Sequence, residues 1–144
     1  MLELINISLK WNSPKEKPFI KNLNLKINNG NILCVFGKSG VGKSSLINVI
    51  AGTNEDNLSF EGEIILNGKI LNNIPIEKRK IGLLLQDGAL FPHLTVEQNI
   101  YFGMNRKLKS KEKLILIYEN LKKANMDGFQ KRYPHTLSGG QKAR

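Results

Sequence analysis

The chain has 144 residues, of which 40% are hydrophobic, and its 22 basic and 12 acidic side chains give a formal charge of +10. Its length fits one domain, and its apolar content allows a buried core and argues against extensive disorder. Its one cysteine excludes an intrachain disulfide, and it contains neither an export signal nor the run of about 18 apolar residues that a membrane-spanning helix needs.

The first thirty residues predict two strands. Hydrophobic residues alternate with polar ones in both, which is the period of a half-buried strand. The second strand covers residues 23–27 and is followed by a tight turn at Asn28-Asn29-Gly30. The hydrophobic face expected for the first strand comprises Ile5, Ile7, Leu9 and Trp11.

Residues 32–36 form a continuous apolar run rather than an alternating one. Such a run is typical of a strand buried on both faces, as in a parallel sheet, and Cys34 within it is expected to be a small core residue. Residues 43–51 then suit a helix, which Gly52 is expected to end.

The middle of the chain predicts further strands. Residues 63–66 form a short strand, Asn67-Gly68 is a strong hairpin signal, and residues 81–85 resemble the earlier buried run. Strands that alternate with helices indicate an α/β fold with a partly parallel sheet.

The last third predicts helices. Thr95 and Gln98 have the spacing of a capping box, and Ser110 is expected to cap a longer helix. One stripe of that helix is apolar, formed by Leu114, Ile117, Leu121 and Ala124. Residues 104–144 carry 11 basic and 3 acidic side chains, a net charge of +8. Because apolar residues interrupt the basic ones at helical spacing, a solvated helix face is favoured over a surface that binds nucleic acid or an anionic membrane.

Residues 37–44 match the pattern G-x-x-x-x-G-K-[ST]. A loop that wraps a triphosphate aims several backbone N–H groups inward, which requires glycine, and the helix after it favours anions at its N-terminus. Lys43 is expected to reach the β- and γ-phosphates, Ser44 to bind Mg²⁺, and Ser45 to lie near the α-phosphate. The other residues expected to contact the nucleotide are Gly37, Ser39, Gly40, Val41 and Gly42. The alternative is a glycine-rich turn with an incidental lysine, which the expected strand before it and helix after it argue against.

Residues 137–141 read Leu-Ser-Gly-Gly-Gln. The chance that this pattern occurs somewhere in such a chain is on the order of 10⁻⁴ from average residue frequencies. The alternative is an ordinary junction between a loop and a helix, with Ser138 as its cap. That alternative does not explain why the pattern accompanies a phosphate loop.

In this order the two motifs resemble those of the ATP-binding cassette (ABC) ATPase family, the motor subunits of ABC transporters. The resemblance makes residues 37–44 the Walker A loop and places Trp11 where the family has an aromatic residue, usually Tyr, that stacks on adenine. It makes Gln86 the glutamine that contacts Mg²⁺ or the attacking water. Lys43 and Gln86 are thus the expected catalytic residues, and ATP and Mg²⁺ the cofactors. Asp87 is expected to be a solvated loop residue.

The resemblance also implies an architecture. It predicts an α/β P-loop NTPase with an N-terminal antiparallel β subdomain and a helical subdomain. Residues 1–86 would form the nucleotide-binding core, 87–136 the helical subdomain, and 137–144 the signature motif and the start of its helix. In the family two cassettes pack head to tail, so the signature motif would contact the partner's ATP through Ser138, Gly139, Gly140 and Gln141.

Further partners follow from the same resemblance. Transmembrane permease subunits and a substrate-binding protein are expected in the complex, which places the chain on the cytoplasmic face of the membrane. Residues 90–100 look like the same region of bacterial importer ATPases, so import is favoured over export. No nucleic acid is expected. A nucleic-acid-associated ABC protein is a weaker alternative, because the chain shows neither paired cassettes nor a long insertion.

Family members need an Asp-Glu pair at the end of a hydrophobic strand and a later histidine, and these 144 residues contain neither. His93 and His135 precede the signature motif and are expected to be loop surface residues. The resemblance therefore predicts a cassette truncated before the Walker B strand, which leaves residues 32–36 as an unpaired apolar edge and the chain alone without ATPase activity. The alternative function is a non-catalytic nucleotide-binding fragment.

Overall fold

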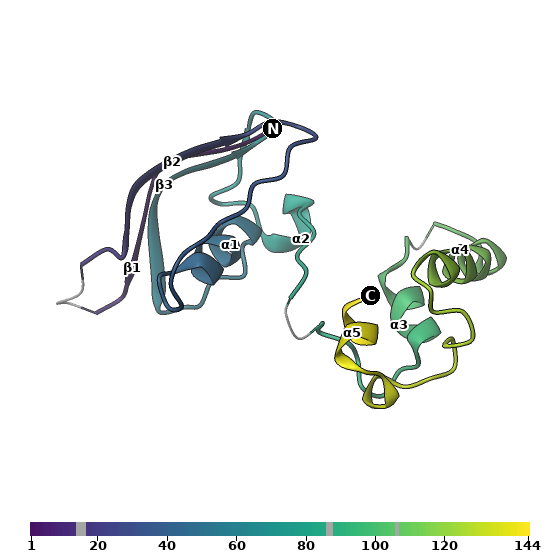
Figure 1. Cartoon of the computed structure of the whole chain (residues 1–144). Coiled ribbons are helices and arrows are strands. Elements are labelled where there is room, and N and C mark those ends of the chain that lie inside the picture. Colours follow the sequence, from purple (N-terminus) through teal and green to yellow (C-terminus); the bar gives the residue numbers. More distant parts are fainter. Residues whose placement is uncertain (14–16, 86–87, 106) are drawn as a thin grey trace. The chain divides into compact units, whose positions relative to one another are not determined.

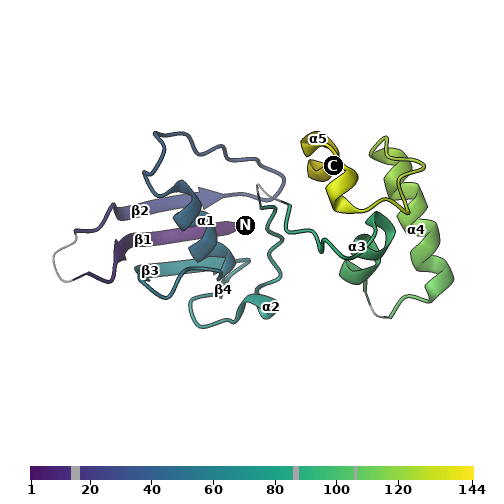
Figure 2. The same ribbon diagram turned by 90° about the horizontal axis from the view of Figure 1, so that it is seen from below.

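The computed structural model describes residues 1–13, 17–85, 88–105 and 107–144. They form two compact units, Met1–Leu83 and Leu84–Arg144 (Figure 1). The first unit contains one four-stranded sheet in the order β2-β1-β3-β4, in which every neighbouring pair is antiparallel. Figure 2 shows these strands side by side. The strands are β1 (Leu2–Trp11), β2 (Ile20–Ile27), β3 (Leu58–Leu66) and β4 (Lys69–Ile70).

A bulge in β1 changes the face that the sequence predicts. The pairing of β1 with β2 shifts between Leu4 and Ile7, and Asn6 lies there at a positive φ of 52°. The side chain of Asn24 holds this bulge by accepting a 2.9 Å hydrogen bond from the Asn6 N–H. Leu4 and Ile7 are therefore both buried, whereas Ile5 is 38% exposed. The expectation that Ile5 shares the buried face of Ile7 is wrong, because the extra residue reverses the alternation.

One helix covers a face of the sheet. Helix α1 (Lys43–Ala51) ends at Gly52 in the left-handed conformation, as the sequence predicts. Figures 1 and 2 show α1 lying against the strands, and its buried side chains join theirs in one core. That core comprises Leu4, Ile7, Leu9, Leu46, Val49, Leu58, Ile64 and Leu71.

The predicted hairpin is confirmed. Leu66 pairs with Lys69, so Asn67 and Gly68 form the turn between β3 and β4. The strand before the turn is longer than the predicted residues 63–66, because β3 begins at Leu58 and pairs with β1 along its length.

Two predicted strands are not formed. Residues 32–36 and 81–85 have no regular structure, and Ile32 and Phe36 are 91% and 90% exposed. Cys34 is exposed too, so its expected burial is wrong. A strand needs a neighbour for its backbone hydrogen bonds, and the described residues supply none for either run. The sheet is consequently antiparallel throughout, without the expected parallel part.

The second unit is helical. Its core joins residues from two helices and the segments after them, namely Val96, Ile117, Leu121, Met126 and Leu137. Its elements are α3 (Val96–Gly103), α4 (Ser110–Lys123), the 3-10 turn η1 (Pro134–Thr136) and α5 (Gly139–Ala143). The longest of these, α4, has 14 residues, and no helix among the described parts of the chain is long and apolar enough to cross a membrane.

One of the two predicted helix starts, that of α4, differs from the prediction by one residue. Thr95 and Gln98 form the predicted capping box of α3. In α4, however, Ser110 is the first helical residue and not the cap. The carboxylate of Glu112 accepts a 2.9 Å hydrogen bond from the Lys109 N–H, which organises this start instead.

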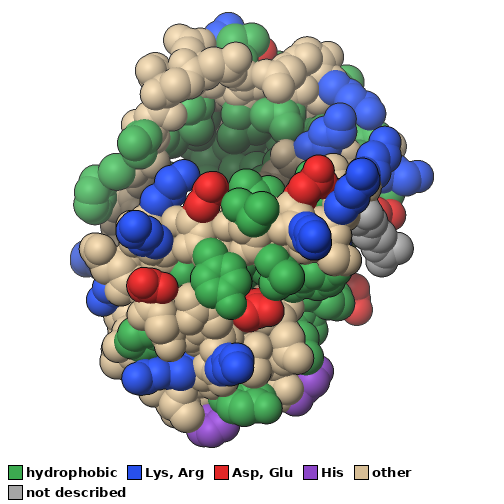
Figure 3. All heavy atoms as spheres, turned by 90° about the vertical axis from the view of Figure 1, so that its right-hand side faces the viewer, with side chains coloured by type: hydrophobic (Ala, Val, Ile, Leu, Met, Phe, Trp, Pro, Cys, Tyr) green, Lys and Arg blue, Asp and Glu red, His purple; other side chains and the backbone are tan. Residues whose placement is uncertain are grey.

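The apolar stripe of α4 is also shifted. Ile117 and Leu121 are buried as expected, but Leu114 is 36% exposed. Lys113 is buried in its place, with its ammonium 4.4 Å from the centre of the Tyr101 ring. Figure 3 shows side chains of both charges among hydrophobic ones on the face that it presents. A lysine stem thus covers apolar surface that a leucine was expected to cover.

Arg79, the last residue of α2 (Ile76–Arg79), is only 6% exposed. Its guanidinium donates to the carbonyl oxygens of Val49 and Ile50, each at 2.9 Å, and to that of Ile74 at 2.8 Å. The first two belong to the last turn of α1, where the Val49 carbonyl also accepts a 3.3 Å hydrogen bond from the Gly52 N–H. Burial lowers the pKa of the Arg79 guanidinium below its ordinary value, but arginine remains charged at every physiological pH.

Replacing Arg79 should therefore destabilise the first unit. We expect Arg79→Met to lower the free energy of unfolding by about 1–3 kcal/mol, because the carbonyls of Val49, Ile50 and Ile74 lose the hydrogen bonds from the guanidinium. Urea unfolding followed by circular dichroism measures this change. Lys78→Met is the matched control, since Lys78 is the exposed neighbour. Equal stabilities of the two variants would contradict the role given to Arg79.

Candidate functional site

The loop before α1 has the backbone shape of an anion cradle. Gly40 and Gly42 have φ values of 80° and 98°, which side chains strongly disfavour. Gly42 is the N-cap of α1, and its carbonyl accepts the first bond of the helix, from the Leu46 N–H at 2.9 Å. The chain therefore passes from the loop directly into a helix, as the sequence motif predicts.

Lys43 folds back over this loop. Its ammonium donates to the carbonyl oxygens of Gly37 and Lys38, at 2.9 and 2.8 Å. An ammonium has three protons to donate, so one donor is left for an oxygen in the space that the loop surrounds. The two bonds hold the positive charge at the loop.

The N-terminus of α1 has no side-chain cap among the described residues, and its first turn contains no acidic residue. By contrast, α3 is capped by Thr95 and α5 by Ser138. The unpaired amides and the positive end of the helix dipole make this terminus suitable for an anion.

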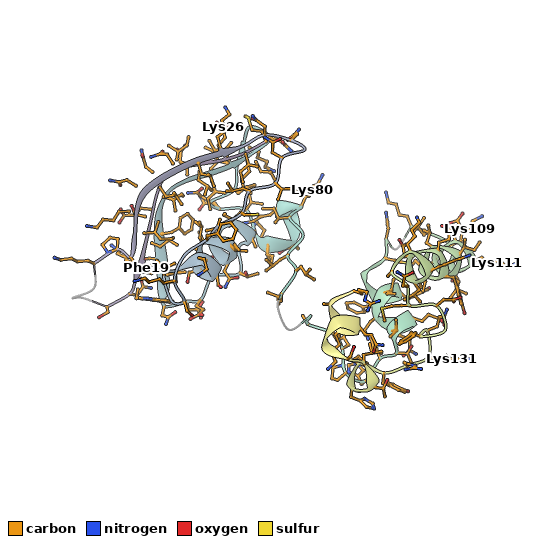
Figure 4. All side chains as sticks on the ribbon, in the orientation of Figure 1. Phe19, Lys26, Lys80, Lys109, Lys111 and Lys131 are labelled. Atoms are coloured by element: carbon orange, nitrogen blue, oxygen red, sulfur yellow. The ribbon has the colours of Figure 1, made fainter. Side chains whose placement is uncertain are left out.

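An aromatic pair lies beside the loop. The rings of Trp11 and Phe19 are stacked, with centroids 5.5 Å apart and planes inclined by 28°. Trp11 ends β1, and Phe19 precedes β2 and donates its N–H to the Leu9 carbonyl at 2.9 Å. Figure 4 labels Phe19 near the beginning of α1. No sequence pattern indicates a role for Phe19, since only its position in space beside the loop does so.

Seven of the predicted residues line one pocket of about 600 Å³. Its walls contain two lysines and, among the described residues, no acidic side chain, so the pocket suits a polyanion. The lining residues are Trp11, Lys17, Phe19, Ser39, Gly40, Gly42, Lys43, Ser44 and Ser45. Gly37 is not a lining residue, but its carbonyl accepts a hydrogen bond from Lys43, and Val41 is 47% exposed at the loop.

The described part of this unit offers few side chains that could bind a divalent cation. No group of three or more His, Cys, Asp or Glu residues that could hold a metal occurs among the described residues. Ser44 offers an exposed hydroxyl at the pocket, which suits a Mg²⁺ ion that takes its other ligands from phosphates and water. Gln86, the other predicted ligand, and Asp87 lie outside the described residues.

The second motif lies in the second unit and begins α5. The Ser138 hydroxyl accepts a 3.3 Å hydrogen bond from the Gln141 N–H, and the Gln141 side chain accepts one of 2.8 Å from the Ser138 N–H. This reciprocal cap leaves the hydroxyl proton of Ser138 free to donate. Gly139 and Gly140 are exposed, and a Cβ at either would meet nothing within 4 Å. His93 and His135 are exposed, as expected.

Comparison with known proteins identifies a matching family. Residues 20–144 match the family described as ABC transporter. The chain is 44% identical, over 127 residues, to the Fe(3+) ions import ATP-binding protein FbpC of Fusobacterium nucleatum, covering 87% of this chain and 33% of that protein. It is 37% identical to the spermidine/putrescine import ATP-binding protein PotA of Mannheimia succiniciproducens, covering 100% of this chain and 37% of that protein. The chain thus spans about a third of the length of these curated relatives.

Solved structures of ABC transporter proteins also match the chain. The chain superposes on the ATP-binding cassette MJ0796, in a dimeric post-hydrolysis state bound to ADP and Pi, with a TM-score of 0.82. The two share 28% sequence identity, and the match covers 99% of this chain and 65% of that one. A second match is cbiO1 from Clostridium perfringens, part of the transporter complex cbiONQ, with a TM-score of 0.78, 28% identity, and coverage of 99% and 57%.

Two glycines of the loop allow a controlled test of its shape. A Cβ added to Gly42 would lie 2.5 Å from Phe19 Cε2, whereas one added to Gly40 would meet nothing within 4 Å. Both have positive φ, so each alanine should cost about 1 kcal/mol of backbone strain. We expect Gly42→Ala to lose about 1–3 kcal/mol more than Gly40→Ala, from the overlap with the ring. Urea unfolding of both variants measures the difference, and equal losses would contradict the close packing.

Proposed function

The chain belongs to the ABC transporter family, and we propose that it binds ATP through residues 37–45 as the ATP-binding part of a transporter. The observation that carries this proposal is the uncapped N-terminus of α1 behind a loop of glycines and one lysine. This arrangement offers backbone N–H groups, a dipole and an ammonium to the same anion. The superposition on a cassette bound to ADP and Pi supports the choice of nucleotide.

The predicted residues of the pocket then have the following roles. Lys43 uses its remaining donor on the β- and γ-phosphates, and the loop amides from Gly37 to Gly42 surround them. Ser45 lies near the α-phosphate. The base stacks on Trp11, whose indole presents a large π-face beside the loop.

Mg²⁺ would be held by the Ser44 hydroxyl, with Gln86 as the second protein ligand. When bound, the ion neutralises charge on the β- and γ-phosphates during hydrolysis. Lys43 adds a fixed positive charge at the same oxygens. Stabilisation of this charge is the main contribution that the described residues make to phosphoryl transfer.

The signature motif is proposed to act on the ATP of a second cassette. Ser138 has a free hydroxyl proton, and the exposed Gly139 and Gly140 carry first-turn amides of α5. Together they could grip the γ-phosphate, with Gln141 as a further contact that also fixes Ser138. Two cassettes would thus close on two ATP molecules and reopen after hydrolysis.

The activity of the whole transporter is proposed from its relatives. FbpC and PotA are import proteins by name, which favours an importer that works with permease subunits and a substrate-binding protein at the cytoplasmic face of the membrane. The chain spans about a third of those relatives. In the assembled cassette, residues 32–36 and 81–85 would become strands of a parallel sheet, beside the antiparallel and helical subdomains. Hydrolysis would then require the Asp-Glu pair and the histidine of the family.

Removing the Lys43 ammonium should weaken ATP binding. We expect Lys43→Ala to raise the dissociation constant by at least about tenfold, because it removes a charge-assisted hydrogen bond at the phosphates. Isothermal titration calorimetry with Mg²⁺ and ATP measures this. Lys38→Ala is the control, since Lys38 contributes a backbone carbonyl to the loop and should change affinity by less than about twofold. Equal affinities of all three proteins would contradict the proposal.

The contact in trans is tested at Ser138. Asp and Asn both preserve a helix cap, but only Ser138→Asp places a negative charge against the γ-phosphate. We expect Ser138→Asp to keep ATP affinity and to weaken ATP-dependent association at least about tenfold. Ser138→Asn should associate far better. Sedimentation velocity with and without ATP measures the association of each variant. Unchanged association of Ser138→Asp would rule the contact out.

A further inference from the structure

Phe19 touches two parts of the pocket that are about thirty residues apart in the chain. On one side its ring stacks on Trp11, at 5.5 Å between centroids. On the other side it lies against the backbone of Gly42, where an added Cβ would be 2.5 and 2.7 Å from Phe19 Cε2 and Cδ2. The same ring therefore packs on the aromatic platform and on the last loop residue before α1.

Hydrogen bonds hold the backbone that carries this ring. The Phe19 N–H donates to the Leu9 carbonyl at 2.9 Å, and the following residue, Ile20, pairs with Leu9 at the start of β2. The Ile20 Cδ1 atom would also lie 3.5 Å from a Cβ on Gly42. Because these groups are close-packed, a shift of Gly42 would press on the Phe19 ring, and through it on the indole of Trp11.

We propose that Phe19 is a positioning residue that couples the phosphate loop to the base-stacking platform, so that an anion bound at residues 37–44 orders Trp11 for the base. The inference rests on the proposed function, since it requires an anion at the loop. Phe19 acts through Trp11 and Gly42, and no contact of its own with the nucleotide is needed. An aromatic ring at position 19 matters because an aliphatic side chain would reach Gly42 but could not stack on an indole.

The single tryptophan of the chain makes the coupling measurable. Inorganic tripolyphosphate occupies a phosphate loop but has no base to touch Trp11. We expect it to change the Trp11 fluorescence of the 144-residue chain, recorded as the difference from Trp11→Phe. In Phe19→Leu this change should fall at least about fivefold, although calorimetry still detects the binding of tripolyphosphate. ATP affinity should fall about 2- to 10-fold, the fold-change that corresponds to one aromatic pair.

Two further variants separate coupling from general stability. Phe19→Tyr keeps the ring and should keep the fluorescence response. Phe60→Leu removes a ring that packs against the core and does not line the pocket, so it should lower stability and leave the response unchanged. A full response in Phe19→Leu would overturn the coupling.

The wild-type chain gives a test that needs no variant at position 19. Calorimetric binding of tripolyphosphate without any fluorescence change would overturn the coupling and leave the proposed function standing. Absence of binding for both ATP and tripolyphosphate would overturn the proposed function itself, and the coupling with it.

Discussion

The uncapped start of α1 is the constraint on which the candidate site depends. A helix terminus normally finds acceptors for its first amides, and α3 and α5 do so with Thr95 and Ser138. At α1 the N-cap is Gly42, which has no side chain to offer. The amides remain available to a ligand, and the neighbouring Lys43 ammonium adds charge without closing the space. At α1 no side chain of the described residues takes up these amides, and an anion would do so instead.

The position of α1 is in turn secured from both ends. At its C-terminus, the buried guanidinium of Arg79 satisfies the carbonyls of Val49 and Ile50. At its N-terminus, the Phe19 ring covers the Gly42 backbone. The apolar side chains of Leu46 and Val49 hold the helix against the sheet between these two points. The amides of the first turn are therefore presented by a helix that has little freedom to move, which preorganises the site.

Local signals in the sequence predicted the local features of this structure. The extent of α1, the cap at Thr95 and the turn at Asn67-Gly68 each depend on a few adjacent residues. The buried face of β1 was partly missed, because the bulge at Asn6 is held by Asn24 on another strand. Phe19 and Arg79 were missed for the same reason. Their roles arise from contacts with residues about 20 to 30 positions away, and no periodic pattern records such contacts.

The apolar run at residues 32–36 is the opposite case, because a strong local signal for a strand is present and no strand forms. Its hydrophobicity predicts a strand, yet Ile32 and Phe36 are almost fully exposed. A strand is a property of a pair of segments, since each backbone must find its hydrogen bonds in a neighbour. Large apolar side chains left in water mark a surface that gains free energy when it is covered. The phosphate loop begins directly after this run, at Gly37. Covering residues 32–36 would thus restrain the loop from its N-terminal side, as Phe19 restrains it at Gly42.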